Sequence, residues 1–201
     1  MALVGVKGYI FIHIYKCGGT SLREILKNDI TFNILKSHST ALEVKKYFYE
    51  KKVFDYFNNS FIFSFIRNPF EWTVSLFNFI KYNVEHENYN EIKEYDFDNF
   101  CKWIVKAIAI KKQNTNGTYN TLTEFLYDNE NNLLVDFVGR LENYEHDIKQ
   151  IAKIINIDIN EIPKLNKNKI QSDYKLYYNP DTKTIIEKLF KKDLENFNYS
   201  F

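Results

Sequence analysis

The sequence has few cysteines and no long apolar run. Cys17 and Cys101 are the only two cysteines in 201 residues, and neither has the spacing of a metal site. Two cysteines this far apart make no disulfide framework, which favours a reducing compartment. No stretch approaches the roughly 20 apolar residues of a membrane-spanning helix. The apolar residues 1–6 are too short for a signal-peptide core, so we expect a cytoplasmic protein without a membrane span.

An excess of one charge is also missing. Lysine and arginine total 27 against 26 acidic residues, a net charge of +1. Nucleic-acid-binding proteins usually carry a basic excess, so this balance argues against a nucleic-acid partner but permits one local basic pocket. The hydrophobic share of 45% and the aromatic share of 17% indicate a packed core. We therefore expect a single domain over residues 1–201.

Short apolar runs alternate with helical patterns along the chain. Residues 9–14 and 60–66 are too short for helices and are interpreted as buried strands, each followed by a turn and a helix. This recurrence predicts an α/β fold like that of P-loop proteins, with three layers and a central, mostly parallel sheet flanked by helices. Ligands bind beyond the carboxyl ends of such strands, where we expect Lys16, His38 and Arg67.

Capping signals and polar stretches predict the boundaries of other elements. Residues 83–95 and 111–121 are polar and predict surface loops, the second with a turn at 116–117. The helix expected at the end of the chain begins near residue 180. N-caps are predicted at Thr40, Asn68, Asp98 and Asn179.

The segment 13–22 has the composition of an anion-binding loop. Its two glycines let the backbone approach an anion, and the following helix offers unpaired N–H groups at its positive end. Lys16 adds a charge, while Thr20 and Ser21 add hydroxyl donors. A Walker loop places its lysine after the last glycine, whereas Lys16 precedes both glycines. A tight turn without a ligand remains the structural alternative.

A second anion-binding element follows the strand at 60–66. Arg67 can place two N–H donors on a phosphate, which lysine cannot do, and Ser75 lies about two helical turns further on. A structural ion pair is the alternative for Arg67.

His38 is the predicted general base among the four histidines. It lies two residues before the N-cap, where the positive end of a helix favours a neutral imidazole. His13 is interpreted as a buried strand residue, His86 as part of a polar loop, and His146 as part of a solvated helix face.

These motifs resemble the sulfotransferases that use 3′-phosphoadenosine 5′-phosphosulfate (PAPS). The resemblance is to the carbohydrate O-sulfotransferases, which include the heparan sulfate 2-O- and 6-O-enzymes and bacterial relatives. Their first motif has the form His-Ile-Pro-Lys-Thr-Gly-Gly-Thr-Ser, where this chain has Tyr15 for proline and Cys17 for threonine. The resemblance implies that the 5′-phosphosulfate is bound by Lys16, Cys17, Gly18, Gly19, Thr20 and Ser21.

The resemblance also implies roles for residues later in the chain. Arg67 and Ser75 match the family's clamp for the 3′-phosphate, and Arg140 lies in a segment that returns to the nucleotide. Trp72 stands where the family often carries another arginine. The resemblance covers nearly the whole chain and is patchy only over about 80–125, which is interpreted as an insertion that selects the acceptor.

The implied reaction is an in-line displacement at sulfur. His38 removes the proton of the acceptor hydroxyl, and Lys16 stabilises the leaving phosphate. The expected partners are the nucleotide donor PAPS and an acceptor with a hydroxyl group, a glycan or another molecule. No metal is expected. The oligomeric state is left open.

Two other functions stay open at this point. Cys17 and Arg23 have the spacing of cysteine-dependent phosphatases, although those enzymes need glycine where Thr20 stands. A phosphatase would also leave Arg67 and Ser75 unexplained. The other alternative is a nucleotide-binding module without turnover.

Overall fold

The computed structural model describes residues 2–35, 38–111, 113–114, 117–159 and 173–201. The chain divides into two compact units. Unit 1 comprises Met1–Arg67 and Glu124–Lys167, and unit 2 comprises Asn68–Thr123 and Asn168–Phe201. The single domain predicted over residues 1–201 stays a prediction.

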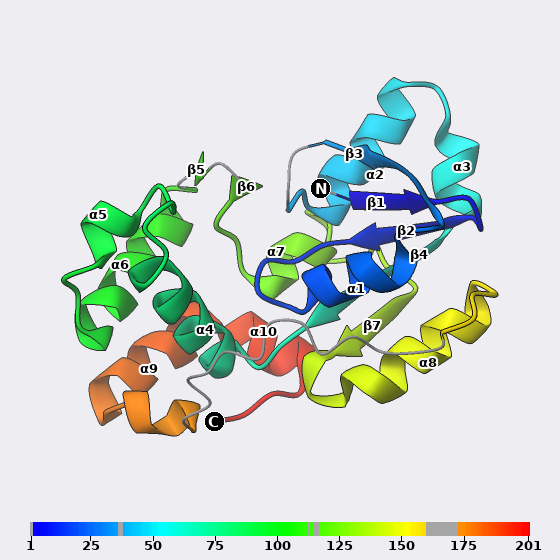
Figure 1. The fold of residues 1–201 in the computed structure, drawn as a ribbon. Helices are drawn as coiled ribbons and strands as arrows, with labels where there is room; N and C mark the ends of the chain where they lie inside the picture. The colour runs from blue at the N-terminus through cyan, green and yellow to red at the C-terminus, as the bar shows by residue number, and fades with distance from the viewer. Residues whose placement is uncertain (1, 36–37, 112, 115–116, 160–172) are drawn as a thin grey trace. The chain divides into compact units, whose positions relative to one another are not determined.

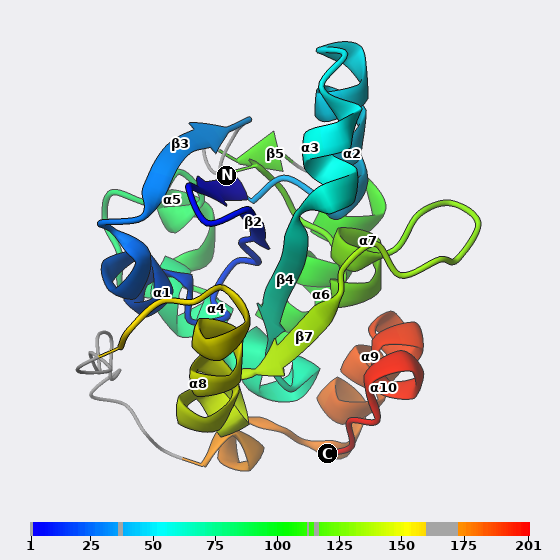
Figure 2. The same ribbon diagram turned by 90° about the vertical axis from the view of Figure 1, so that its right-hand side faces the viewer.

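Unit 1 contains a five-stranded sheet with the strand order β3-β1-β2-β4-β7 (Figure 1). The neighbouring strands β2, β4 and β7 are parallel, and Figure 2 shows β4 and β7 side by side with the same direction. β1 is antiparallel to both β2 and β3. The predicted α/β class is therefore confirmed. The strands are β1 (Ala2–Gly5), β2 (Tyr9–Ile12), β3 (Ile30–Ile34), β4 (Phe61–Ile66) and β7 (Phe137–Arg140).

Helices accompany this sheet within unit 1. The connection from β2 leads into a helix of this unit, as the strand, loop and helix pattern predicted. The helical elements are α1 (Gly19–Leu26), α2 (Ala41–Glu50), α3 (Phe54–Asn59), α8 (Tyr144–Ile154) and the 3₁₀ helix η1 (Leu141–Asn143).

The register of the parallel strands sets the edge at which the candidate residues lie. Ile12 is paired with Ser64, and Ile66 is paired with Arg140. The Ser64 hydroxyl donates a hydrogen bond of 2.7 Å to the Ile12 carbonyl, which ties β4 to β2 inside the buried sheet. The segments that follow β2, β4 and β7 therefore begin at the same edge of the sheet.

Unit 2 consists mainly of helices around an aromatic core. The rings of Tyr177 and Tyr178 contact the rings of two helices: Tyr177 lies 5.5 Å from Phe97, and Tyr178 lies 5.5 Å from Phe70, between centroids. α7 (Leu122–Leu126) begins in this unit and ends in unit 1. The other elements are α4 (Pro69–Lys81), α5 (Tyr89–Ile92), α6 (Phe97–Ala109), β5 (Gln113–Asn114), β6 (Gly117–Thr118), η2 (Tyr174–Tyr177), α9 (Pro180–Leu189) and α10 (Lys191–Phe197).

Most capping predictions agree with the structure. Thr40 and Asn179 form capping boxes, and the Asn68 side chain accepts a hydrogen bond from the N–H of Phe70. The prediction for Asp98 was wrong. The N-cap is Asp96, whose side chain accepts from the third N–H of the helix, so α6 begins two residues earlier than expected.

Three boundary predictions need correction or stay open. The stretch 83–95 is not only a surface loop, because it contains α5 and the buried residues His86 and Ile92. α9 is not the last helix, since α10 follows it. The turn predicted at 116–117 falls partly outside the described residues.

Candidate active site

The loop between β2 and α1 depends on its two glycines. Gly18 has φ 82°, and a Cβ there would come within 2.8 Å of the Leu141 side chain. A Cβ on Gly19 would collide with the ring of His13, so this ring lies directly against the backbone of the loop. Any side chain at either position would deform the loop. α1 then begins at Gly19, whose first turn presents backbone N–H groups at the positive end of a helix.

Lys16 lies in this loop and has an unusual backbone conformation and a lowered pKa. It is half-buried and has φ 60°, a region that non-glycine residues rarely adopt. Its pKa is lowered to about 8, chiefly by burial and also by the charge of Arg67, while Cys17 acts in the opposite direction. The structure therefore brings the two predicted cations together beyond the ends of β2 and β4. Such a pair favours the binding of an anion.

The other predicted residues of the loop differ in exposure. Thr20 is exposed, Ser21 is buried, and Cys17 is 1% exposed. The Cys17 N–H donates to the Ile14 carbonyl at 3.3 Å. Their contacts with a phosphosulfate stay predictions.

His38 is held by a hydrogen bond to the backbone. Its Nδ1 lies 2.9 Å from the carbonyl oxygen of His13. A carbonyl can only accept, so Nδ1 carries the proton and Nε2 keeps its lone pair. Burial lowers the pKa of His38 to about 4, which leaves the ring neutral at pH 7. The neutral form therefore arises mainly from burial, rather than from the start of α2 as the sequence predicts.

His13 is the residue that the sequence interpretation missed. Rather than lying inside the strand, it is the first residue after β2, and its ring centroid lies 4.5 Å from that of His38. Burial lowers the pKa of His13 well below its ordinary value, and the neighbouring His38 adds to this effect. The available signal was its position at a strand end, three residues before Lys16.

Arg140 and Ser75 lie in different units. Arg140 ends β7, beside the strand that leads to Arg67, and its backbone N–H donates to Asp147 at 2.7 Å. Ser75 lies in α4 of unit 2 and is 5% exposed. The predicted roles of both residues in nucleotide binding stay predictions.

Trp72 has a structural contact where the resembling family often carries arginine. Its ring packs against Phe190 within unit 2, with centroids 5.6 Å apart and planes inclined by 71°. The indole is buried, so this position contributes to the core of the unit.

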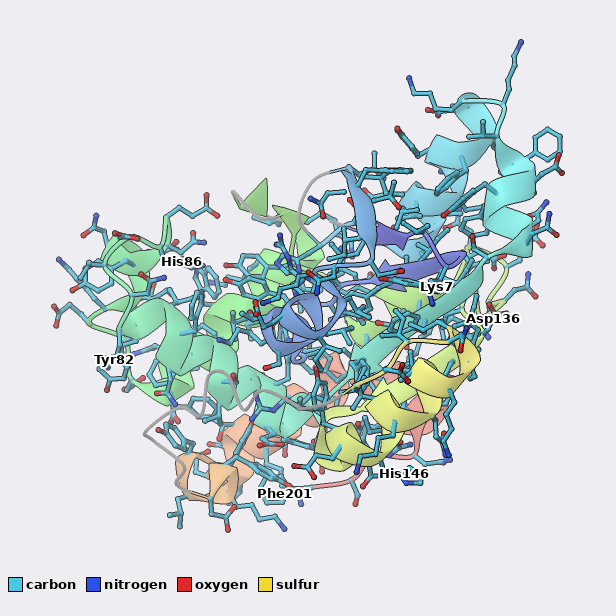
Figure 3. The ribbon with its side chains drawn as sticks, turned by 45° about the vertical axis from the view of Figure 1, so that its right-hand side comes forward. Lys7, Tyr82, His86, Asp136, His146 and Phe201 are labelled. Carbon is cyan, nitrogen blue, oxygen red and sulfur yellow. The ribbon has the colours of Figure 1, made fainter. Side chains whose placement is uncertain are left out.

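The two remaining histidines have structural or solvent-exposed positions (Figure 3). His86 is buried, and its Nδ1 accepts a hydrogen bond of 3.1 Å from the N–H of Asn88. His146 is exposed on α8. Within the described ranges, no group of three or more His, Cys, Asp or Glu could hold a metal ion. No helix of the part that the structure describes is long and apolar enough to cross a membrane.

Comparisons with known proteins identify a family and a fold. The model of the sulfotransferase family matches residues 4–200. The chain is similar to the crystal structure of mouse sulfotransferase SULT7A1 complexed with PAP, with a TM-score of 0.57 and 13% sequence identity. The match covers 92% of this chain and 84% of that chain, and at this identity it shows the fold. No curated protein matches the sequence.

Proposed function

Because this chain belongs to the sulfotransferase family, we propose that it transfers a sulfuryl group from PAPS to a hydroxyl of an acceptor. The observations that carry the proposal are the cations Lys16 and Arg67, which follow two parallel strands of the sheet, and a neutral His38 whose Nδ1 lies 2.9 Å from the His13 carbonyl oxygen. The ligand named for the mouse sulfotransferase also supports it. That ligand, 3′-phosphoadenosine 5′-phosphate (PAP), is what remains of PAPS after transfer.

Two groups of residues are proposed to bind the donor. Lys16 and the N–H groups at the start of α1 bind the 5′-phosphosulfate through charge-assisted hydrogen bonds. Arg67 clamps the 3′-phosphate, with Ser75 as a hydroxyl donor and Arg140 as a further cation. The parallel strands β4 and β7 end at the same edge of the sheet, which supports a role for both arginines at one site.

Proton transfer and charge stabilisation are proposed to carry the chemistry. The acceptor oxygen forms a bond to sulfur as the bond between sulfur and the phosphate oxygen breaks. His38 takes the hydroxyl proton at Nε2, the nitrogen that its bond to the His13 carbonyl leaves unprotonated. Lys16 neutralises the charge that develops on the leaving phosphate.

The acceptor is proposed to be a carbohydrate hydroxyl. The first motif supports this, because it resembles that of carbohydrate O-sulfotransferases, including bacterial members. Residues of about 80–125 are proposed to select the acceptor, and the cytoplasm is proposed as the location. A screen with labelled PAPS against sugars, glycans and small phenols tests the acceptor class.

The structure bears on one of the two alternative functions, the cysteine-dependent phosphatase, and leaves the nucleotide-binding module open. A cysteine-dependent phosphatase needs its cysteine and arginine to meet at the substrate, but Cys17 is 1% exposed and Arg23 is solvent-exposed. The geometry therefore disfavours it. A nucleotide-binding module would keep the clamp without the chemistry, and only turnover separates it from an enzyme.

Binding of PAP compared with AMP tests the donor site. Calorimetry should show far tighter binding of PAP than of AMP, because Arg67 is proposed to bind the 3′-phosphate, which AMP lacks. Arg67→Ala should weaken PAP binding by about 1.5–3 kcal/mol and leave AMP binding unchanged, as expected for a lost charge-assisted hydrogen bond. Arg23→Ala is the matched control and should bind PAP like the wild type. Equal affinities of the wild type for PAP and AMP would remove the basis of the assignment.

A further inference from the structure

His38 is contacted by two residues of the segment that follows β2. The His13 carbonyl accepts its Nδ1 proton at 2.9 Å, and the His13 ring lies 4.5 Å away between centroids. The Tyr15 ring lies 4.7 Å away, with the two planes inclined by 85°. His38 follows His13 by 25 residues, so these contacts are tertiary and depend on the folded unit.

The backbone conformation of His38 is one that surrounding contacts must stabilise. Its φ of 60° is rare for a residue with a side chain and persists only where surrounding contacts fix it. A single hydrogen bond to His13 does not fix the imidazole, because rotation of the side chain can break that bond. A ring packed edge-to-face against the imidazole removes this freedom.

We propose that Tyr15 is a positioning residue, whose ring holds the His38 imidazole so that Nε2 faces the acceptor hydroxyl. The proposal rests on the function proposed above. It also explains why tyrosine can stand where the resembling sulfotransferases carry proline, since proline has no aromatic ring for this contact. Tyr15 acts through the orientation of His38 and takes no proton itself.

The test compares three variants in the full chain. Tyr15→Ala should lower kcat by about tenfold or more, because a small misplacement of a catalytic group is costly. PAP affinity should stay within about twofold, since Lys16 and Arg67 are untouched. Tyr15→Phe keeps the ring and should restore kcat. Tyr49→Ala removes an exposed aromatic ring from α2 and should behave like the wild type.

Nitrogen NMR of the His38 side chain supplies a readout that does not need turnover. The wild type should show a protonated Nδ1 and an unprotonated Nε2 at pH 7. Tyr15→Ala should show a mixture of both tautomers, and Tyr15→Phe the wild-type signature. The tautomer reports whether Nδ1 keeps its bond to the His13 carbonyl, and therefore whether the ring keeps its orientation.

The outcomes separate the proposal from its premise. Wild-type kcat and an unchanged nitrogen signature in Tyr15→Ala would overturn the positioning role. A parallel loss of PAP affinity and kcat would also overturn it, because Tyr15 would then support the phosphate loop. If the wild type transfers no sulfuryl group to any acceptor, the proposed function fails, and the nitrogen signature alone decides the role of Tyr15.

Discussion

Buried polar groups have different surroundings in the two units. In unit 2, both carboxylate oxygens of Asp193 accept hydrogen bonds from backbone N–H groups, of Leu122 at 2.7 Å and Thr123 at 2.8 Å. In unit 1, burial lowers the pKa of Lys16, and the nearby positive charge of Arg67 lowers it as well. The first arrangement stabilises the fold, whereas the second places like charges side by side and costs stability.

This difference indicates where the chain carries its function. Perturbed pKa values cluster at functional sites, and backbone strain is kept where it contributes to activity. Lys16 and His38 show both features, since each has φ 60° and a lowered pKa. Substitutions at the edge of the unit 1 sheet should therefore alter activity, and substitutions at Asp193 should alter stability.

The largest effect is expected from His38→Ala. A general base contributes about 10²–10⁴-fold, so kcat should fall by this factor while PAP affinity stays near that of the wild type. Steady-state kinetics and calorimetry measure the two quantities. The control is His146→Ala, which removes an exposed imidazole from α8 of the same unit.

The pH profile sharpens this assignment. The pKa of His38 is lowered to about 4, so the neutral base predominates above that value. The wild-type kcat/KM should stay level from neutral pH to about pH 5 and decline as the ring gains a proton near pH 4. Wild-type kcat in His38→Ala would refute the assignment, and loss of kcat in His13→Ala instead would transfer the role to His13.

Asp193→Ala should show the opposite behaviour. It leaves two buried N–H groups at the start of α7 without their acceptor, which costs about 1–3 kcal/mol of unfolding free energy. Urea denaturation measures the loss, and PAP affinity of the folded protein should not change. Asp181→Ala, at an exposed position in α9, is the control and should unfold like the wild type. Full stability of Asp193→Ala would break the contrast between the two units.

Local patterns predicted much of the fold. The strands β2 and β4 were predicted because short apolar runs have few alternatives, and the caps at Thr40 and Asn179 because their hydrogen bonds span only three residues. The strand β1 was missed because its pairing with β2 and β3 is tertiary. α5 was missed because its single turn lies in a mostly polar stretch.

The candidate site was predictable in part for the same reason. Lys16 and the glycines form a contiguous motif, so the sequence alone indicated an anion-binding loop. The contact of His13 with His38 joins residues 25 positions apart, and the influence of Arg67 on Lys16 joins residues of two different strand ends. Such effects depend on how the strands pair, which single-sequence patterns do not specify.

The smallest expected effect concerns Lys16 and again tests the like charges of unit 1. Its pKa of about 8 in the free protein means that it loses its proton as the pH rises above 8. Bound phosphate favours the charged lysine and raises this pKa, so PAP should bind about tenfold more weakly at pH 9 than at pH 7. Calorimetry in two buffers of different ionisation enthalpy should show proton uptake on binding at pH 9 and almost none at pH 7. Lys16→Arg keeps its charge throughout this range, so its PAP affinity should not change between the two pH values. Equal wild-type affinities at pH 7 and pH 9 would mean that Lys16 remains charged, and the contrast with unit 2 would then lose its electrostatic basis.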